Sequence, residues 1–585
     1  MADFRTENYD TYRGANTILT GVSSTPYLSN TASVSDGEAW NYDIYHQVTY
    51  DKKIADKHRI NLTGLFEVQE GESTNTSFSG TGIPADYVQN TNAAQYASTI
   101  TASAAGNNYS KSGLISYMAR LNYTFNEKYN LTATYRRDAS SRLSEENKWT
   151  DYPALAASWN ASEESFLKGI SWLSNLRVRA GWGKSANQAV APYATLGNLA
   201  SNNYNFGGST VTGFYVSVLP NPGLKWETTT TTNFGVDFGF FRNRLSGSID
   251  IYKATTENIL VRKSLPLSNG ADAIVTNAAS TKSHGVEIVL SAVPIDTKSG
   301  FKWVIDANWS MNREEITALE EPGKTQDIGN GWFVGQPLTV IYDFKKIGIW
   351  QEKDAALAAQ YGAPQAVGRI RVEDKNNDMK IDANDMQVVG TFEPKWVAGF
   401  TNRFTYKGFD LSVVAFARWG GTAVATYFQS NNGGTGGYAF FGQARGNQWK
   451  VDYWTKTNPT NAFPHPEGQA LNDNYASTLG YYDATFIKVR SINIGYQIPS
   501  KFLTRAGISS CRVFATVTNP FIVYSPMVRD GYAIDPEGTG TANIGNPAVL
   551  TPQGGSSNAA PNRAITLHIT TPPTREFLFG LNLKF

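Results

Sequence analysis

The sequence predicts an all-β fold, a transmembrane antiparallel β-barrel with long loops on one side. Three observations predict it: residues alternate between apolar and polar, the connections differ in length, and the composition is rich in aromatic residues and poor in charge. Strands point successive side chains to opposite faces, so one face can meet lipid and the other a polar lumen. A strand of a soluble β-sandwich alternates in the same way, so alternation alone does not distinguish it from a membrane barrel. The connections and the composition distinguish the two.

Segments with this alternation recur along the chain, between stretches rich in Gly, Asn, Ser and Thr. Residues 117–135 form a predicted hairpin with its turn at 126–128, and residues 234–251 form another with its turn at 242–243. The same pattern predicts further strands near residues 38–50, 57–70, 149–162, 174–185, 284–295, 300–313, 395–406, 409–420, 486–498, 511–524 and 574–585.

Two of these strands have one wholly apolar face. In the strand at 574–585, the apolar face consists of Phe577, Phe579, Leu581, Leu583 and Phe585. In the strand at 234–240, we expect Phe234, Val236, Phe238 and Phe240 to face lipid. Gly235, Asp237 and Gly239 alternate with them and are expected to face the lumen.

The connections between these strands fall into two classes. A few are only some residues long, at 126–128, 241–243 and 407–408. Others run for tens of residues, at 71–112, 187–224, 317–394, 421–485 and 525–573. Short turns on one side and long loops on the other are typical of a membrane barrel, whereas a propeller would show an even period. The lengths therefore favour a barrel over a propeller or an array of sandwiches.

Composition narrows the class of protein further. Hydrophobic residues make up 41% and charged residues 17%, with 30 Tyr, 30 Phe and 14 Trp among 585 residues. We find no run of about 18 apolar residues that would cross a membrane as a helix. Abundant aromatic residues are typical of barrels with aromatic girdles, although a secreted β-sandwich array or a propeller has a similar composition.

Charge, cysteine and histidine content argue against several functions. The net charge of +1 gives no basic excess, so we expect no nucleic-acid partner. Cys511 is the only cysteine, which excludes a disulfide framework or a cysteine-based metal site within the chain. The five histidines form no HExxH pair, and no nucleophile elbow is present. We therefore expect the protein not to be an enzyme.

The strand count bears on the extent of the domain. Roughly fifteen or sixteen strands are predicted, against about 22 in plugged outer-membrane transporters. Met1–Asp10 also has no basic segment followed by an apolar one, as a signal peptide would. We therefore interpret residues 1–585 as one partial barrel domain, without the plug domain, the early strands and the signal peptide.

Open sheet edges have no hydrogen-bond partners in lipid. The interpretation as a partial barrel therefore predicts partners for both end strands. We expect the strand near 38–50 to pair with a preceding strand outside this chain. The strand at 574–585 should pair with the first strand of the full barrel.

Several motifs occur in the order of a known family. They include Arg136–Arg142, Leu176–Gln188, Asn221–Glu227, Phe486–Arg490 and Asp535–Glu537. On these motifs the chain resembles the SusC/RagA family of TonB-dependent (TonB-linked) outer-membrane transporters, and the resemblance covers roughly residues 40–585. It implies a multi-pass barrel in the outer membrane of a Gram-negative, Bacteroidetes-like bacterium.

The resemblance also implies a function and partners. The function is active uptake of oligosaccharides or peptides, with a SusD-like surface lipoprotein as the lid. TonB–ExbB–ExbD would supply energy through the plug region, which has no counterpart in this sequence, so energy coupling is assigned to no residue. The alternatives are a structural or assembly component of a larger envelope complex and a passive porin.

An acidic loop at Asp374–Asp385 is the strongest local motif. Oxygen-bearing side chains occupy the ligand positions of an EF-hand-like calcium loop, and Ile381 occupies its apolar position. Two features depart from that loop: Met379 replaces the usual Gly, and Asp385 is shorter than the usual Glu. The alternative is a metal-free turn built from Asx residues. The predicted calcium ligands are Asp374, Asn376, Asp378, Asp382 and Asp385.

Aromatic residues also cluster in one long predicted loop. Such rings can stack on sugars or on peptide side chains, but they can equally pack the loop against its neighbours or a lid partner. The candidate substrate-binding residues are Tyr427, Tyr438, Phe440, Phe441 and Trp449.

Overall fold

A computed structural model describes residues 2–585, except 14–29, 84–94, 103–107, 188–189, 321–322, 364–365, 426–427, 429–449, 466–474, 504–506, 538–564 and 568–572. The chain divides into two compact units. The first unit contains Met1–Ala157, Trp182–Thr230 and Asn258–Asn277, and the second contains Ser158–Gly181, Thr231–Glu257 and Ala278–Phe585.

The described residues are mainly β-strands, and nineteen of the strands belong to one sheet. Sixteen of these are long strands: β1 (Ala2–Arg13), β2 (Thr31–Ile54), β3 (His58–Thr81), β5 (Asn108–Phe125), β6 (Tyr129–Ser140), β7 (Trp149–Asn160), β8 (Leu173–Asn187), β11 (Glu227–Phe240), β12 (Leu245–Ser264), β13 (Ala273–Asp296), β14 (Lys302–Leu319), β21 (Trp396–Tyr406), β22 (Phe409–Trp419), β25 (Phe486–Ile498), β26 (Ser510–Tyr524) and β28 (Glu576–Lys584). The other three are β4 (Thr99–Ala102), β9 (Asn198–Phe206) and β10 (Ser209–Leu219).

The remaining elements lie in the connections. The short strands are β15 (Gln326–Asp327), β16 (Trp332–Phe333), β17 (Val340–Asp343), β18 (Lys346–Ile349), β19 (Ile370–Val372), β20 (Gln387–Thr391), β23 (Thr422–Ala425), β24 (Tyr481–Asp483) and β27 (Ile565–Leu567). The α-helices are α1 (Ala355–Gln360) and α2 (Pro526–Arg529). Single 3₁₀ turns are η2 (Glu145–Asn147), η3 (Ala161–Glu163), η4 (Ala194–Leu196), η5 (Leu267–Asn269), η6 (Glu352–Asp354), η7 (Ala383–Asp385), η10 (Ala476–Gly480) and η11 (Ser500–Phe502). Among the described residues, no helix is long and apolar enough to cross a membrane.

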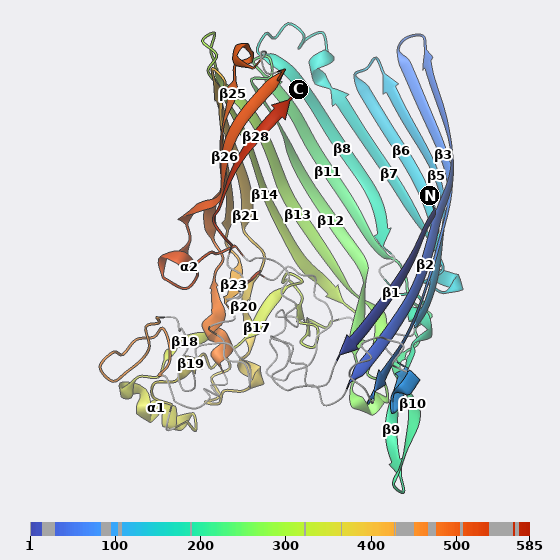
Figure 1. Ribbon diagram of the computed structural model, residues 1–585, viewed down its shortest axis with the longest axis vertical. Coiled ribbons are helices and arrows are strands. Elements are labelled where there is room, and N and C mark those ends of the chain that lie inside the picture. The colour runs from blue at the N-terminus through green and yellow to red at the C-terminus, as the bar shows by residue number, and fades with distance from the viewer. Residues whose placement is uncertain are drawn as a thin grey trace. The chain divides into compact units, whose positions relative to one another are not determined.

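In the first unit, β1, β2, β3, β5 and β6 pair antiparallel in that order. These strands run side by side in the blue part of the chain in Figure 1. Tight turns join β2 to β3 at Ala55-Asp56 and β5 to β6 at Asn126-Glu127, and all four of these residues have positive φ. Type I′ turns require that backbone at both central positions, and their twist matches that of the strands they join. The predicted hairpin at 117–135 is therefore confirmed.

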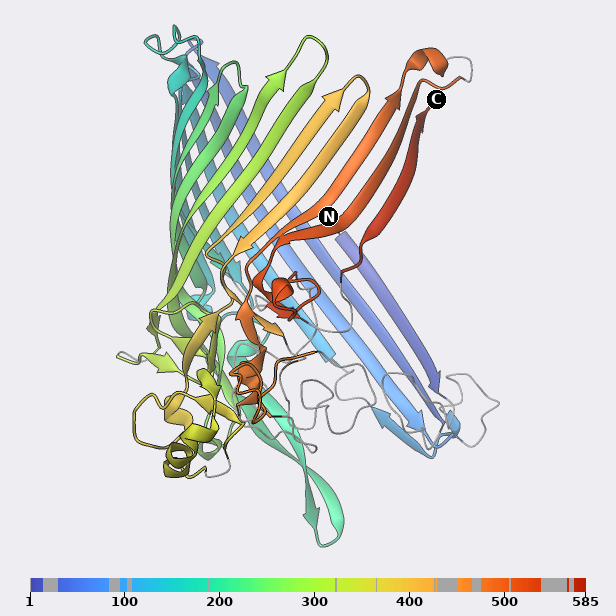
Figure 2. The same ribbon diagram turned by 90° about the vertical axis from the view of Figure 1, so that its left-hand side faces the viewer.

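In the second unit, β13, β14, β21, β22, β25, β26 and β28 form a second antiparallel series. Figure 2 shows its last strands in orange and red. Lys407 (φ 45°) and Gly408 (φ 90°) make the tight turn between β21 and β22, as the short connection predicted. One edge of β28 pairs antiparallel with β26. Its pairing with the first strand of a full barrel stays a prediction.

The strand near residues 38–50 has an in-chain partner that the sequence pattern did not predict. β1 pairs with residues 31–42 of β2, from Ala2↔Tyr42 to Arg13↔Thr31. The expectation that this strand pairs with a preceding strand outside the chain is therefore wrong for residues 38–42. β1 escaped prediction because eight of its twelve residues are polar or charged and neither face is apolar throughout. Its position is set by backbone hydrogen bonds to β2, which do not depend on side-chain pattern.

Strands of the nineteen-stranded sheet extend into two of the predicted loops. In the predicted loop at 71–112, β3 continues to Thr81 and β5 begins at Asn108, and the two strands pair up to Asn75↔Asn108. The predicted loop at 187–224 contains the hairpin of β9 and β10, with the turn at Gly207-Gly208. Ser and Thr dominate the end of β3, and this polar segment pairs with β2 as far as Thr31↔Thr81.

The largest hydrophobic core lies in the connections of the second unit and not between layers of sheet. Its buried residues include Phe344, Ile349, Phe428, Phe463 and Met527. The first unit has a smaller cluster of Leu143, Val190, Leu224 and Trp226. Many large apolar residues of the strands are exposed instead. This distribution agrees with the expectation that the strands face an apolar phase.

Candidate functional site

A polar face runs along neighbouring strands of the second unit. Arg179 of β8 donates to both carboxylate oxygens of Asp237 in β11, from Nε and Nη2, at 2.9 Å each. Its Nη2 also donates to Asp250 of β12 at 3.0 Å. The bidentate geometry makes this one of the stronger kinds of charged hydrogen bond. One guanidinium thus links two strands that follow β8 in the sheet.

Gly235 belongs to the same face and leaves room for this network. A Cβ atom at Gly235 would lie 2.5 Å from Asp250 Oδ1 and 2.7 Å from Arg179 Nη2. On the opposite face of β11, Phe234 is 50% exposed and the rings of Phe238 and Phe240 stack at 5.3 Å. The predicted alternation of polar and aromatic faces is therefore present. Its assignment to lumen and lipid stays a prediction.

The first unit has a comparable network around Arg136 of β6. The guanidinium pairs with Glu67 of β3 and with Asp138, both at 2.8 Å, and donates to Ser116 of β5 at 2.8 Å. Ser116 and Asp138 are buried. Three strands thus contribute to one ion-paired cluster, and Arg136 begins one of the motifs on which the family resemblance rests.

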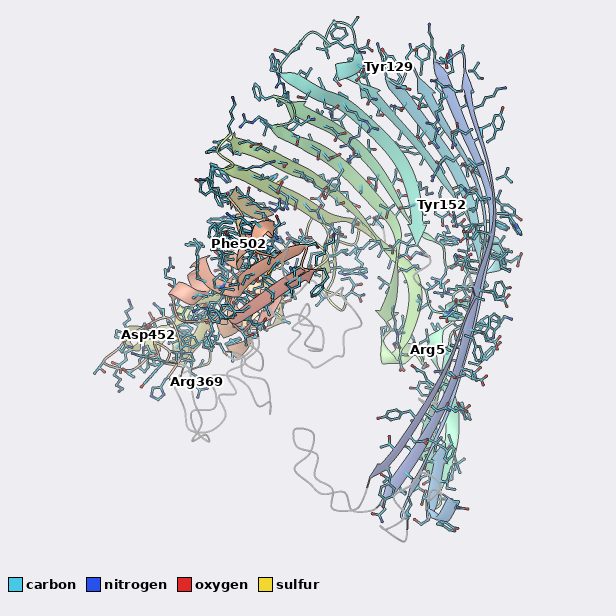
Figure 3. The ribbon with its side chains drawn as sticks, turned by 45° about the horizontal axis from the view of Figure 1, so that its top comes forward. Arg5, Tyr129, Tyr152, Arg369, Asp452 and Phe502 are labelled. Carbon is cyan, nitrogen blue, oxygen red and sulfur yellow. The ribbon has the colours of Figure 1, made fainter. Side chains whose placement is uncertain are left out.

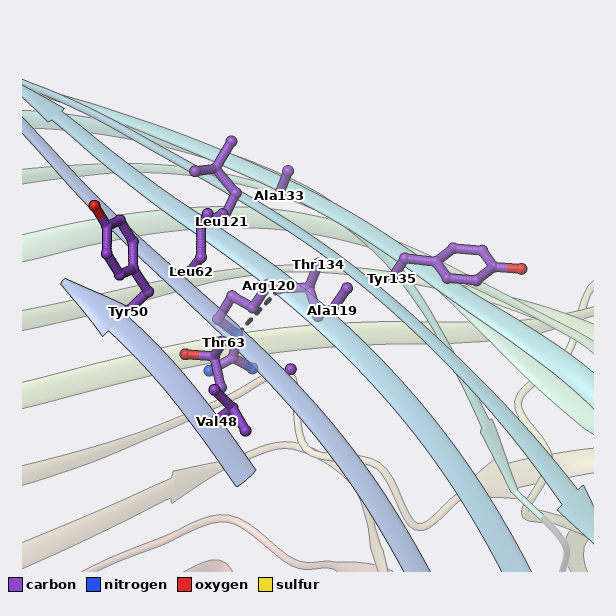
Figure 4. Close-up of a pocket in the computed structure, with 11 residues that line it drawn as sticks. Val48, Tyr50, Leu62, Thr63, Ala119, Arg120, Leu121, Ala133, Thr134 and Tyr135 are labelled. Atoms are coloured by element: carbon purple, nitrogen blue, oxygen red, sulfur yellow. Dashed lines mark hydrogen bonds between the residues drawn. The ribbon is translucent and has the colours of Figure 1, made fainter. Parts of the chain in front are cut away.

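β2 and these three strands also line a mainly apolar groove of about 510 Å³, shown in Figure 4. Its lining includes the small residues Gly64 and Ala119 and the larger residues Leu62, Leu121 and Tyr135. A Cβ atom at Gly64 would contact nothing within 4 Å. Hydrocarbon fits such a surface better than a polar substrate does.

In the second unit, the described residues of 320–395, 421–485 and 525–537 fold around a core of their own, and we call these described residues the loop region. β17 pairs with β20, and β18 pairs with β19. Polar turns are fixed as well: Asp452, labelled in Figure 3, accepts hydrogen bonds from Thr460 and Asn458. Loops with this much internal structure can present side chains in defined positions.

A buried ion cluster joins two of the family-like motifs. Lys488 of β25 is 1% exposed, and its Nζ lies 2.7 Å from Asp535 and 3.2 Å from Glu537. Arg490 pairs with Glu537 and places its guanidinium 4.0 Å from the centre of the Phe416 ring. The motif at 486–490 thus fixes the chain that follows α2.

In the acidic loop, the carboxylates accept hydrogen bonds from the loop's own backbone. Asp374 accepts from the N–H groups of Asp378 and Met379 at 3.3 and 3.0 Å. Asp385, which is fully buried, accepts from Lys375 and Asp382 at 2.9 and 2.8 Å. Among the described residues, no three of the His, Cys, Asp and Glu side chains form a group suited to a metal.

Met379 occupies the position at which an EF-hand calcium loop normally has glycine. Met379 has φ +66°, in the left-handed region that favours glycine. Burial raises the pKa of the Asp374 carboxyl, but hydrogen bonds from the Met379 N–H and the Tyr361 hydroxyl outweigh it, and the pKa lies below its usual value. Turns built from Asx residues account for these contacts without an ion. Calcium binding stays a prediction.

The aromatic candidates for substrate binding lie outside the described residues. These are Tyr427, Tyr438, Phe440, Phe441 and Trp449. Sequence reasoning did not single out Arg179, Lys488 or their partners as interacting groups. The carboxylates that pair with them lie about 50 to 70 residues away in sequence, as for Arg179 and Asp250 (|i−j| of 71), so no local spacing reveals them.

Comparison with known proteins assigns the family. Residues 2–519 match the family model described as "TonB dependent receptor-like, beta-barrel". TonB-dependent receptor P26 of Formosa agariphila is 28% identical over 559 residues, covering 94% of this chain and 53% of that protein. TonB-dependent receptor SusC of Bacteroides thetaiotaomicron is 31% identical over 448 residues, covering 72% of this chain and 42% of that protein.

The fold has a solved counterpart. The structure of the RagAB peptide transporter superimposes with a TM-score of 0.74 at 20% sequence identity, covering 100% of this chain and 59% of that chain. The chain spans about half the length of the curated relatives it matches, as the 53% coverage of P26 shows. The predicted resemblance and the predicted location are confirmed. The chain is an outer-membrane protein and belongs to the family of TonB-dependent receptor-like β-barrels, among members similar to SusC and RagA.

Proposed function

We propose that this protein takes up oligosaccharides or peptides actively across the outer membrane. Energy would come from TonB–ExbB–ExbD, and a SusD-like lipoprotein would close over the outer side. The observation that carries the proposal is the two-faced strand in a chain of this family. Ion-paired charges such as Arg179 and Asp237 line one face, and exposed rings such as Phe234 line the other.

A two-faced strand of this kind suits a barrel that encloses a polar path through lipid. The loop region adds a second requirement of a selective transporter. Its segments have a core of their own, with Phe428 and Phe463 almost fully buried. Folded loops can hold binding groups in fixed positions, whereas a passive porin needs only an open path. This difference favours selective uptake.

The relatives support the energy source and the peptide class of substrate, and the oligosaccharide class rests on the family resemblance. SusC and P26 are described as TonB-dependent receptors, and RagAB is described as a peptide transporter and importer. The family comprises transporters and receptors, so we propose no catalytic activity for this chain. Either peptides or oligosaccharides would suit polar strands and aromatic loops.

Uptake in living cells tests the proposal. The gene would be deleted in its own host, and import of fluorescently labelled oligosaccharides and peptides would be measured in this strain, in the wild type and in a strain without TonB. We expect import of one substrate class to be lost in both mutant strains. Import that persists without TonB would indicate a passive porin. Unchanged import with altered envelope composition would indicate an assembly role.

A further inference from the structure

A cavity of about 360 Å³ opens in the loop region of the second unit. This volume is near the lower end of the range for ligand pockets, roughly 300–1,000 Å³. Its walls combine aromatic rings with one half-buried ammonium group. The residues that matter for the argument are Phe344, Phe463, Tyr481, Tyr482, Tyr532 and Lys346.

The aromatic wall is built from rings that support one another. The rings of Tyr482 and Tyr532 lie 4.8 Å apart at 35°, and those of Phe463 and Tyr532 lie 6.1 Å apart at 48°. Phe463 is buried, whereas Tyr482 and Tyr532 are partly exposed. Partly exposed rings on a packed base are a suitable surface for a sugar ring or an apolar side chain.

Lys346 has no counter-ion among the residues that the structure describes. Its Nζ donates to the carbonyl oxygen of Ala462, and among the described residues no carboxylate forms an ion pair with it. Burial lowers the pKa of the ammonium to about 8. The neighbouring Lys345 differs, because its side chain is exposed and pairs with Glu373 at 3.2 Å. A partly buried cation without an anion is unfavourable unless a partner arrives.

Two carboxylates of the loop region, Asp343 and Glu373, are engaged by other groups. Asp343 accepts hydrogen bonds from the hydroxyls of Ser477 and Tyr481, both at 2.6 Å, and from the Phe344 N–H at 2.7 Å. Glu373 accepts from Lys345 at 3.2 Å and from Gln387 at 2.6 Å. Neither carboxylate pairs with Lys346, so the ammonium charge of Lys346 remains available to a ligand.

We propose that this cavity binds a ligand that carries a carboxylate next to a ring or an apolar group. The carboxylate would pair with Lys346 Nζ, and the ring or apolar group would lie against Tyr482 and Tyr532. The inference rests on the proposed function and deepens it, because the ligand is then part of the transported substrate. Two substrates offer this chemistry: a glycan with an acidic sugar, and a peptide with a free C-terminus or an acidic side chain.

Binding to the purified protein, as the cell makes it, tests the inference. The probes are glucuronate against glucose, and N-acetylphenylalanine against its amide, measured by saturation-transfer NMR and calorimetry. We expect one acid to bind at least about tenfold more tightly than its neutral counterpart, because hydrogen bonds to charged groups contribute that much. Preference for glucuronate would indicate an acidic glycan, and preference for N-acetylphenylalanine a peptide.

Three variants assign the binding to one side chain. Lys346→Met should reduce the affinity for the acid at least about tenfold, and Lys346→Arg should retain most of it. Lys456→Met is the matched control, because Lys456 lies in the same region, is 80% exposed and pairs with Glu352. This control should bind as the wild type does.

The pH dependence gives a second readout that needs no destabilising change. Affinity of the wild type should fall as pH rises from 7 to 9.5 and the ammonium loses its proton, whereas Lys346→Arg should show no such fall. The other titratable groups around Lys346 stay the same in both proteins: Lys345, Glu373, Asp343, Tyr481, Tyr482 and Tyr532.

Two outcomes overturn the inference: neither acid binds better than its neutral counterpart, or the acid binds Lys346→Met as tightly as the wild type. If that occurs while uptake still requires TonB, the carboxylate site is wrong and the transport function stands. If the acid binds as expected but uptake does not require TonB, the transport function is wrong instead.

Discussion

In the second unit, the strands of the sheet and the loop region place their large apolar side chains in opposite ways. Phe577 and Phe579 of β28 are 65% and 77% exposed. Phe392 and Phe463 of the loop region are 1% and 2% exposed. The strands therefore need an apolar phase around them, whereas the loop region buries its apolar side chains in its own core. The strands are stabilised by their hydrogen-bond ladders and by lipid, and the loop region by a packed core.

The first prediction tests this contrast with one substitution in each region. Phe463→Ala should destabilise the loop region by about 3–5 kcal/mol, because it leaves a cavity in a packed core. Phe579→Ala removes an equally large ring from an exposed face and should change the stability in detergent far less. Protease resistance of the loop region and heat-modifiable electrophoretic mobility measure the two effects. Equal losses from both substitutions would contradict the contrast.

The second prediction concerns the ion cluster that fixes the segment after α2. Lys488→Met should cost about 3 kcal/mol, because breaking a buried pair leaves Asp535 without its cation. The double variant Lys488→Met with Asp535→Leu should recover part of the loss, since an apolar pair replaces the ionic one. The measurement is protease resistance of residues 525–537.

A control for this cluster is available nearby. Arg529→Met breaks an ion pair with Asp530 whose side chains are 66% and 43% exposed, and it should cause no measurable change. If Lys488→Met is as silent as this control, the cluster does not stabilise the segment.

The third prediction tests which face of β11 meets lipid. Phe234→Arg should cost about 2–4 kcal/mol, because Phe234 is central in a 14-residue strand and near the expected midplane. Phe238→Arg should cost less, since Phe238 is two residues from the end of the strand at Phe240. Asp237→Asn should be mild, because Arg179 keeps its contact with Asp250. Folding into lipid vesicles, monitored by electrophoretic mobility, measures all three. If Phe234→Arg and Asp237→Asn were tolerated equally well, the assignment of the two faces to lipid and lumen would be wrong.

The smallest effect is expected for calcium at the acidic loop. If calcium binds, linkage stabilises the loop by about 1.4 kcal/mol at ten times the dissociation constant. Protease resistance with and without calcium, in the wild type and in Asp378→Ala, measures the effect. Asp452→Asn, in another polar turn of the loop region, should leave it unchanged. Absence of any calcium-dependent change in the wild type would leave the metal-free turn as the description of this loop.

Several parts of the fold and of the site could be predicted because they depend on local chemistry. The alternation of Phe234, Asp237 and Phe238 follows from the geometry of a strand. The hairpins at 126–128 and 407–408 follow from their short connections. The long connections were predicted by length, but their internal strands were not, because short polar segments have no strong period.

The sequence by itself determined that the chain has two-faced strands, tight turns on one side and long loops on the other. Only the tertiary structure decided which charges pair, because Arg179, Asp237 and Asp250 meet through the lateral order of strands. The same holds for β1, whose polar residues become a strand only because β2 offers backbone partners. It holds also for Lys346, which no carboxylate of the described residues pairs with, because Asp343 and Glu373 have partners of their own. Local pattern follows from covalent geometry, whereas pairing and burial depend on residues that are distant in sequence and adjacent in space.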